Sequence, residues 1–119
     1  MYIRLDNISI HANHGVMPQE RTIGGDFEVD LRVGYDYSAA LVSDDVSDTL
    51  DYSRLYLIVK EEMEVPSNLL EHVAGRIASH IINDFPECTS IDIEIRKIAP
   101  PFGGKVSAAA VELHVENNG

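Results

Sequence analysis

Four stretches of the chain alternate apolar and polar residues with a period of two, and this pattern limits the possible folds more than any other feature. Successive side chains of a strand point to opposite faces of a sheet, so each stretch is predicted to be a strand with one buried face. In the first stretch the alternation changes phase at Asp6 and Asn7, which predicts a β-bulge. The apolar positions are Ile3, Leu5, Ile8, Ile10, Ala12, Phe27, Val29, Leu31, Val33, Ile91, Ile93, Ile95, Ala109, Val111, Leu113 and Val115.

Between the second and third stretches the apolar period changes to that of an amphipathic helix, and it does so twice. The first helix is expected to begin with Ser53 as its N-cap and to end at Pro66. Its inward residues are expected to be Leu55, Ile58, Val59 and Met63.

The second helix is expected to begin at Asn68 and to end at Pro86. Glu71 lies three residues after Asn68, which is the spacing of a capping box, so one interpretation of Glu71 is a structural helix cap. The inward residues of this helix are expected to be Leu69, Leu70, Val73, Ile77, Ile81 and Phe85.

The resulting order is strand, strand, helix, helix, strand, strand (ββααββ). This order predicts an α+β fold, a four-stranded antiparallel sheet with two helices packed on one face. An irregular loop is expected over 12–25, and an acidic connector with a helical turn over 38–52. The two long alternating edges of such a sheet are a liability unless they are paired, so closure into a ring of subunits is a plausible solution.

The 119 residues suffice for a single domain, 1–119, with its own core. A formal charge of −11 without a Lys/Arg cluster disfavours nucleic acid and anionic membranes as partners. No apolar run is long enough to span a membrane, and the first ten residues lack the layout of a secretory signal. Cys88, the single cysteine, fits a reducing compartment, so a cytoplasmic location is expected.

Several local features could carry chemistry, but each is weak when taken alone. They are His14-Gly15 with Glu20, Tyr52, Leu70-Glu71, Lys97, and the run Pro100-Pro101-Phe102-Gly103-Gly104. A solvated loop acid, a half-buried tyrosine, a strand-end lysine and a turn are the bland interpretations of these features.

Taken together, the segments "NHGVMPQE", "DTLDY", "NLLEH" and "KIAPPFGG", in this order and over this length, resemble dihydroneopterin aldolase. The resemblance covers nearly the whole chain. It implies the tunnelling fold, a tetrameric ring of subunits that is usually stacked into a homo-octamer, and pterin pockets between neighbouring subunits. It also implies a lyase of folate biosynthesis that cleaves 7,8-dihydroneopterin into 6-hydroxymethyl-7,8-dihydropterin and glycolaldehyde, with 2′-epimerisation as a side activity.

The resemblance also assigns catalytic roles at the matching positions. Lys97 is expected to be the general acid/base, Glu20 to orient that lysine and the substrate hydroxyls, and Tyr52 to relay a proton across a subunit boundary. The substrate's own N5=C6 imine can accept the electrons of the breaking bond. Neither a cofactor nor a metal ion is therefore expected.

Substrate binding is assigned in the same way. Glu71 is expected to hold the 2-amino and N3–H groups of the pterin, assisted by a backbone group near Leu70. Two hydrogen bonds to a charged group are worth more than one capping contact, so this role outweighs capping. Tyr52 and Glu20 are expected to border the pterin and its side chain, and His14 to fix the loop or to touch the side-chain hydroxyls.

Two positions depart from the family pattern, and two rival functions stay open. Asp51 stands where many relatives have Asn or His, and Lys105 where His is frequent. The rivals are dihydroneopterin triphosphate epimerase and a pterin-binding ring without catalysis. A zinc site built from His11, His14 and His72 is disfavoured, because only one pair of these histidines is close in sequence.

Overall fold

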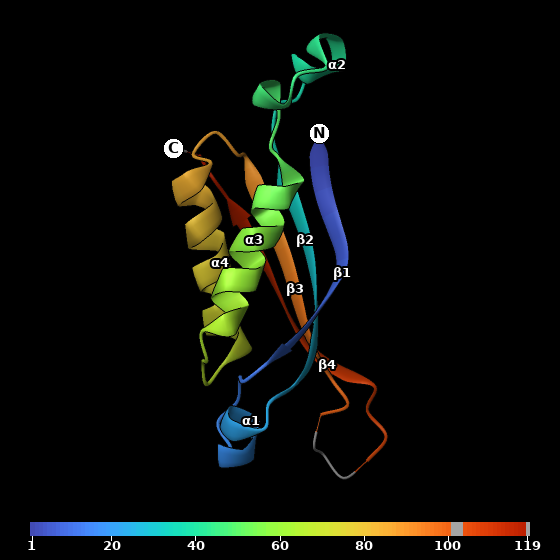
Figure 1. The fold of residues 1–119 in the computed structure, drawn as a ribbon, viewed down its shortest axis with the longest axis vertical. Coiled ribbons are helices and arrows are strands. Elements are labelled where there is room, and N and C mark those ends of the chain that lie inside the picture. The colour runs from blue at the N-terminus through green and yellow to red at the C-terminus, as the bar shows by residue number, and fades with distance from the viewer. Residues whose placement is uncertain (101–103, 119) are drawn as a thin grey trace.

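The computed structural model describes residues 1–100 and 104–118, in which four strands form one antiparallel sheet in the order β1-β2-β3-β4 (Figure 1). The strands are β1 (Tyr2–Ala12), β2 (Gly25–Gly34), β3 (Ser90–Ile98) and β4 (Ala108–Glu116). The α+β class and the four strands predicted from the alternation are confirmed. Because β1 and β4 lie at the two edges, each has one side without a strand partner among the described residues.

The predicted bulge in β1 is confirmed. The pairing of β1 with β2 shifts between Leu5 and Ile8, and Asn7 has a positive φ of 56°. The Asn7 amide donates to Asp30 Oδ1 at 2.7 Å, so this irregular backbone is held by a neighbouring strand. The shift returns Ile8 and Ala12 to the buried face, which the change of phase in the sequence required.

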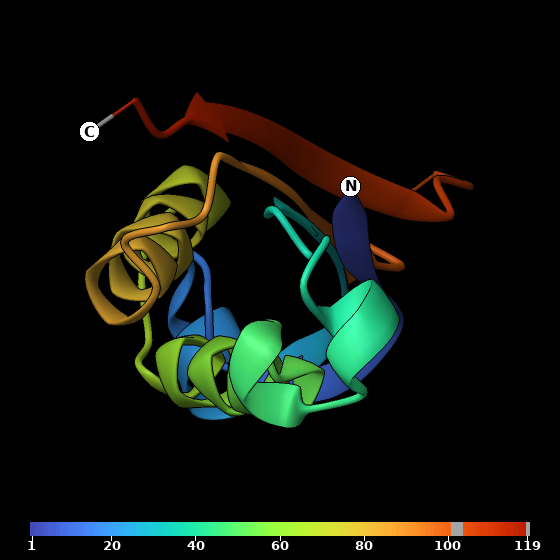
Figure 2. The same ribbon diagram turned by 90° about the horizontal axis from the view of Figure 1, so that it is seen from above.

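Helices α3 (Tyr52–Glu64) and α4 (Leu70–Asp84) cover the same face of the sheet, as seen from above in Figure 2. α3 packs on β1, and α4 packs on β3 and β4. The predicted inward side of α3 is confirmed, since Leu55, Ile58, Val59 and Met63 are all buried. In α4, Val73, Ile77 and Ile81 are buried, Leu70 and Phe85 are partly buried, and Leu69 is exposed, contrary to the prediction.

Both predicted N-caps are wrong. α3 begins two residues earlier than expected, with Asp51 as the N-cap, whose Oδ1 accepts from the Ser53 amide at 3.0 Å. α4 begins at Leu70 after Leu69, and no side chain caps it. Asn68 instead accepts a hydrogen bond from the Arg21 guanidinium at 2.7 Å, because the first loop packs beside it.

Three short helical segments add to the predicted order of elements. α1 (Pro18–Thr22) lies in the loop that was predicted to be irregular, so that prediction is wrong. The helical turn expected in the acidic connector is confirmed by α2 (Ala40–Ser43) and the 3-10 segment η1 (Val46–Asp48). Figure 1 shows α1 and α2 at opposite ends of the molecule.

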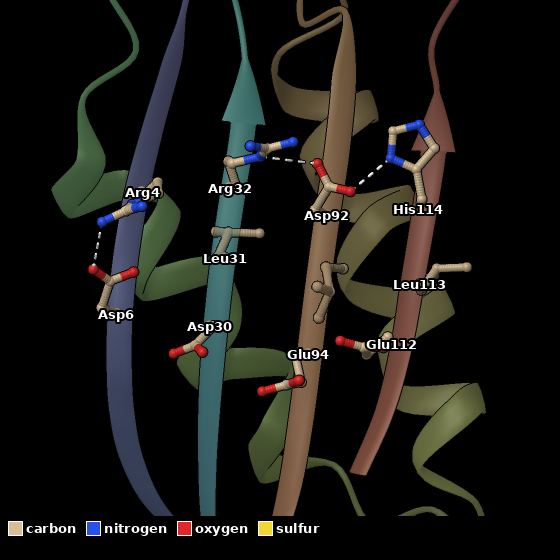
Figure 3. Close-up of a pocket in the computed structure, with 11 residues that line it drawn as sticks. Arg4, Asp6, Asp30, Leu31, Arg32, Asp92, Glu94, Glu112, Leu113 and His114 are labelled. Carbon is tan, nitrogen blue, oxygen red and sulfur yellow. Dashed lines mark hydrogen bonds and ion pairs between the residues drawn. The ribbon is translucent and has the colours of Figure 1, made fainter.

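The face of the sheet that the helices leave open is charged (Figure 3). Along one row, Arg32 donates to Asp92 at 3.2 Å, and Asp92 contacts His114 at 2.6 Å. Hydrogen bonds with Asp92 and Glu116 raise the pKa of His114. This face therefore accounts for the polar half of the alternation. Glu20 and Lys97, two of the residues suggested by the sequence, lie elsewhere, at the end of the sheet beside α1.

Candidate active site

A pocket of about 220 Å³ lies where the first loop meets the end of β3. Both polar and apolar groups line it, including His14, Gln19, Glu20, Phe27, Lys97 and Ile98. Lys97 reaches this place because β2 and β3 pair in a register that sets it opposite Phe27. The pocket thus joins residues of the first loop to a strand near the other end of the chain.

Glu20 and Lys97 form an ion pair inside this pocket, between Oε2 and Nζ. Their side chains are only 16% and 19% exposed, so the pair is largely shielded from solvent. The hydrogen bond from Lys97 lowers the pKa of Glu20. The other carboxylate oxygen of Glu20 accepts from the Met17 amide at 3.3 Å, which fixes the carboxylate at the start of α1. The resting pair is therefore an ammonium facing a carboxylate.

Gly15 is required by this arrangement. Its φ is +149°, and a Cβ at this position would lie 2.4 Å from the carboxyl carbon of Glu20. A residue with a side chain would be strained by its backbone and would also displace the carboxylate. The glycine that follows His14 therefore lets the loop close on Glu20.

His14 is 1% exposed and borders the same pocket. Its Nδ1 accepts a hydrogen bond from the Ser67 amide at 3.1 Å, so the proton of the neutral ring is on Nε2. Burial, together with the nearby charge of Arg76, lowers the pKa of His14 to about 4. The ring is therefore neutral near pH 7 and fixes the loop, one of the two roles expected for it.

Glu71 lies near the start of α4 and does not line the pocket that holds Lys97. It is exposed and borders an open groove with His72 and Arg76. Within residues 1–100 and 104–118, its carboxylate takes part in none of the side-chain hydrogen bonds or ion pairs, so it does not act as a cap. Leu70, beside it, is partly buried against the core.

Glu71 nevertheless lies at the same end of the molecule as the ion pair. The turn before α4 is bonded to the first loop three times: by the Gly15 amide to the Ser67 carbonyl at 2.9 Å, by the Ser67 amide to His14 Nδ1 at 3.1 Å, and by Arg21 to Asn68. The structure therefore brings Glu20, Lys97 and His14 into one pocket and places Glu71 on an adjacent surface.

Tyr52 lies at the other end of α3, and the residue is 63% exposed. Thirteen helical residues span about 20 Å at a rise of 1.5 Å per residue, and α3 runs from Tyr52 toward the turn before α4 (Figure 1). Tyr52 therefore cannot reach the Glu20–Lys97 pocket of its own chain.

Comparison with known proteins shows which family the chain belongs to. The model of the dihydroneopterin aldolase family matches residues 3–114. A Staphylococcus epidermidis dihydroneopterin aldolase is 38% identical over 117 residues, which cover 98% of this chain and 97% of that protein. The chain belongs to the dihydroneopterin aldolase family.

Solved structures of this family have the same fold. A Vibrio cholerae crystal structure assigned to dihydroneopterin aldolase has a TM-score of 0.89 and 26% identity, covering 98% of this chain and 97% of the other. The Escherichia coli dihydroneopterin aldolase in complex with neopterin also has a TM-score of 0.89, at 23% identity, covering 97% and 98% of the two chains.

Three residues that support this candidate site were missed in the sequence. Phe27 was assigned only to the core, although its ring lies 5.8 Å from Lys97 Nζ and contacts His14 edge-on. Ser67 and Arg76 hold the turn before α4. No local pattern distinguishes them, because their contacts join segments that are distant in sequence.

His11 and His14, two of the three histidines of the disfavoured zinc site, lie in different environments. The His11 ring is bonded to the Ile23 carbonyl at 2.9 Å and to Asp26, on the exposed part of β1, whereas His14 is buried. Across residues 1–100 and 104–118, no three His, Cys, Asp or Glu side chains are arranged to hold a metal ion. In the same residues, no helix is long and apolar enough to cross a membrane.

Part of the final motif cannot be compared with the structure. Pro101, Phe102 and Gly103 lie outside the described residues, whereas Gly104 and Lys105 are exposed beyond them. Ala99, at the rim of the pocket, has a positive φ of 48°, so the chain turns sharply as it leaves β3.

Proposed function

We propose that this chain cleaves 7,8-dihydroneopterin into 6-hydroxymethyl-7,8-dihydropterin and glycolaldehyde, a retro-aldol step of folate biosynthesis. The observation that carries the proposal is the shielded Glu20–Lys97 ion pair, in a chain 38% identical to a dihydroneopterin aldolase. Residues 1–119 would act as one catalytic domain of the tunnelling fold.

The reaction needs a group that moves protons near a bound, electron-poor ring. The 2′-hydroxyl must lose a proton, the C1′–C2′ bond must break, and C1′ must then be protonated. The electrons of the broken bond pass into the N5=C6 imine of the substrate, so a lysine Schiff base is not needed. Lys97, paired with Glu20, is placed to donate a proton near N5 and to exchange protons with the side chain through water.

Glu71 is the proposed anchor for the pterin ring. Its carboxylate can accept from the 2-amino group and from N3–H in a bidentate arrangement, and a backbone amide at the start of α4, near Leu70, which no side chain caps, can assist. The E. coli relative with this fold is a complex with neopterin, which supports a pterin as the ligand here. His14 and Glu20 would contact or orient the hydroxylated side chain.

The complete site would form between subunits. A pocket of about 220 Å³ is smaller than the roughly 300–1,000 Å³ of typical small-molecule sites, so one chain encloses only part of a ligand. Tyr52 lies too far from Lys97 to act in its own chain, and both sheet edges lack strand partners among the described residues. A tetrameric ring, stacked into a homo-octamer, would pair these edges and bring Tyr52 of one subunit to the pocket of the next.

The expected setting is the cytoplasm, which the single, buried and free Cys88 supports.

Epimerisation at C2′ is a proposed side activity, because the two fragments can recombine on the other face before release. A dihydroneopterin triphosphate epimerase and a non-catalytic pterin-binding ring are the alternatives. Lys97, paired with Glu20, is the one cation among the described residues that line the pocket, and this gives the triphosphate little to bind.

The test is product analysis with the purified chain and 7,8-dihydroneopterin. Glycolaldehyde and 6-hydroxymethyl-7,8-dihydropterin in equal amounts are expected, with a smaller amount of dihydromonapterin. Epimer without aldehyde would indicate the epimerase, and tight pterin binding without turnover would indicate the binding ring. Light scattering of the same sample measures the size of the assembly.

A further inference from the structure

Arg76 is the most extensively bonded side chain between the two helices. It lies on α4 five positions after Glu71, and its side chain is 21% exposed. Its guanidinium donates to the Glu62 carbonyl at 2.9 Å, to Glu62 Oε1 at 2.7 Å, to the Val65 carbonyl at 2.8 Å and to Ser67 Oγ at 3.0 Å. Arg76 therefore ties α4 to the end of α3 and to the turn that joins the two helices.

Ser67, in that turn, is bonded through three of its groups and is 8% exposed. Its hydroxyl accepts from Arg76, its amide donates to His14 Nδ1 at 3.1 Å, and its carbonyl accepts from the Gly15 amide at 2.9 Å. Two of these three bonds hold the first loop, and the third reaches α4. Ser67 therefore connects the loop that carries Glu20 to the helix that carries Glu71.

The connection continues by direct contact to the ion pair. Gly15 packs so closely on Glu20 that a Cβ there would overlap its carboxyl group, and Glu20 pairs with Lys97. Movement of the Ser67 turn would therefore shift Gly15 against Glu20. Neither Arg76 nor Ser67 lines the pocket that holds Lys97, so neither is placed to contact the reacting atoms. Arg76 borders the groove beside Glu71, but both terminal nitrogens of its guanidinium are bonded to α3 and to the turn.

We propose that Arg76 and Ser67 are positioning residues that fix the distance between the pterin anchor on α4 and the Glu20–Lys97 pair. This inference rests on the proposed function, since it gives the two ends of the connection their roles. Proton transfer depends steeply on distance, and a misplacement of about 1 Å can cost roughly 100-fold in rate. Binding by Glu71 is local to α4 and is much less sensitive to this distance.

The proposal predicts that loosening this connection lowers turnover but leaves the affinity for the pterin nearly unchanged. In the full-length chain, Arg76→Gln should lower kcat for 7,8-dihydroneopterin by about 10–100-fold. It should leave the Kd for neopterin, used as a non-cleaved probe, within about threefold. Ser67→Ala removes only the hydroxyl bond and keeps both backbone bonds, so a smaller fall in kcat is expected. The double variant should be little worse than Arg76→Gln, because both substitutions break one connection.

Arg32→Gln is the matched control, because it removes a guanidinium that bonds a neighbouring strand on the open face of the sheet (Figure 3). Its kcat should equal that of the unchanged chain even where its Tm falls. Arg76→Lys keeps the charge but not the planar fork, so it should fold and should still lose kcat.

Equal losses of kcat and affinity in Arg76→Gln, or an unchanged kcat in both Arg76→Lys and Ser67→Ala, would overturn the proposal. An unchanged chain that binds neopterin but releases no glycolaldehyde would overturn the proposed function and this inference with it. Cleavage by the unchanged chain together with normal kcat in the variants would overturn the positioning role alone.

Discussion

The Lys97 ammonium and the Glu20 carboxylate form an ion pair although 77 positions separate them in the chain. Two features of the fold bring them together. The register of β2 and β3 sets Lys97 opposite Phe27, and α1 presents Glu20 over the same place. Because the pair is largely shielded from water, its charges interact more strongly than those of an exposed pair. Removing one member is therefore expected to lower the rate of the chemical step.

Lys97→Ala should therefore remove most turnover of 7,8-dihydroneopterin while keeping the affinity for neopterin within about tenfold. The reason is that the amine acts on the reacting bonds, whereas the ring is held elsewhere. Single-turnover kinetics and a fluorescence titration measure the two quantities. Lys60→Ala, at an exposed position of α3, is the control and should change neither. A tenfold or smaller fall in turnover for Lys97→Ala would contradict its role.

Glu71→Ala should mainly weaken pterin binding, in contrast to Lys97→Ala. Loss of two hydrogen bonds to a charged group costs about 3–6 kcal/mol, so neopterin binding should weaken by at least 100-fold. Since Glu71 caps no helix and pairs with no cation among the described residues, the Tm should stay within about 2 °C. Glu61→Ala, exposed on α3, is the control for the lost charge. Weak binding accompanied by a large fall in Tm would instead indicate a structural role.

Asp51 and Ser53 offer a test of which residue caps α3. Asp51 Oδ1 accepts from both the amide and the hydroxyl of Ser53, so Asp51→Ala should cost about 1 kcal/mol and lower the Tm by roughly 3–6 °C. Asp51→Asn keeps a good N-cap and should lower it by less than about 1 °C. Because Tyr52 is the first residue of α3, turnover should fall with the cap in Asp51→Ala. A larger loss for Ser53→Ala than for Asp51→Ala would show that Ser53 is the cap.

The strands and helices could be predicted from the spacing of apolar residues in the sequence. The contacts between these elements could not. Alternation and helical period encode which side of a local segment is buried, so the strands, the bulge at Asn7 and the inward side of α3 could be predicted. The caps were wrong because Asp51, Ser53 and Asn68 are all good cap residues, and tertiary contacts decide among them. Arg21 engages Asn68, which removes it from the start of α4.

The same distinction applies to the candidate site: its proposed catalytic and binding residues could be predicted, but their arrangement could not. Glu20, Lys97, Glu71 and Tyr52 were predicted through the resemblance, but the register of β3 decides that Lys97 meets Glu20, and the direction of α3 decides that Tyr52 lies far from both. Sequence patterns do not report either quantity. Ser67 and Arg76 have no recognisable motif, because their importance arises only where the first loop packs against the turn before α4.

Burial of the neutral His14 ring should make the free energy of unfolding depend on pH. Its pKa is about 4 in the folded state and about 6.5 in an unfolded chain, so the unfolded state binds more protons between these values. The free energy of unfolding should therefore fall as pH is lowered through this window, by about 2 kcal/mol between pH 7 and pH 5. Protonation would also place two donors, the ring and the Ser67 amide, against each other.

Urea unfolding at pH 7 and pH 5 measures this contribution when it is compared with His14→Asn, which keeps an acceptor near the position of Nδ1 but does not titrate. The difference between the two chains should shrink by about 2 kcal/mol on going to pH 5, because only the unchanged chain loses stability through this group. His114→Gln is the contrasting control. The pKa of His114 is raised by Asp92 and Glu116, so it stabilises the fold at low pH and loses that effect as pH rises through its raised pKa. A His14 ring whose NMR titration midpoint lies near 6.5 would contradict the buried, neutral state.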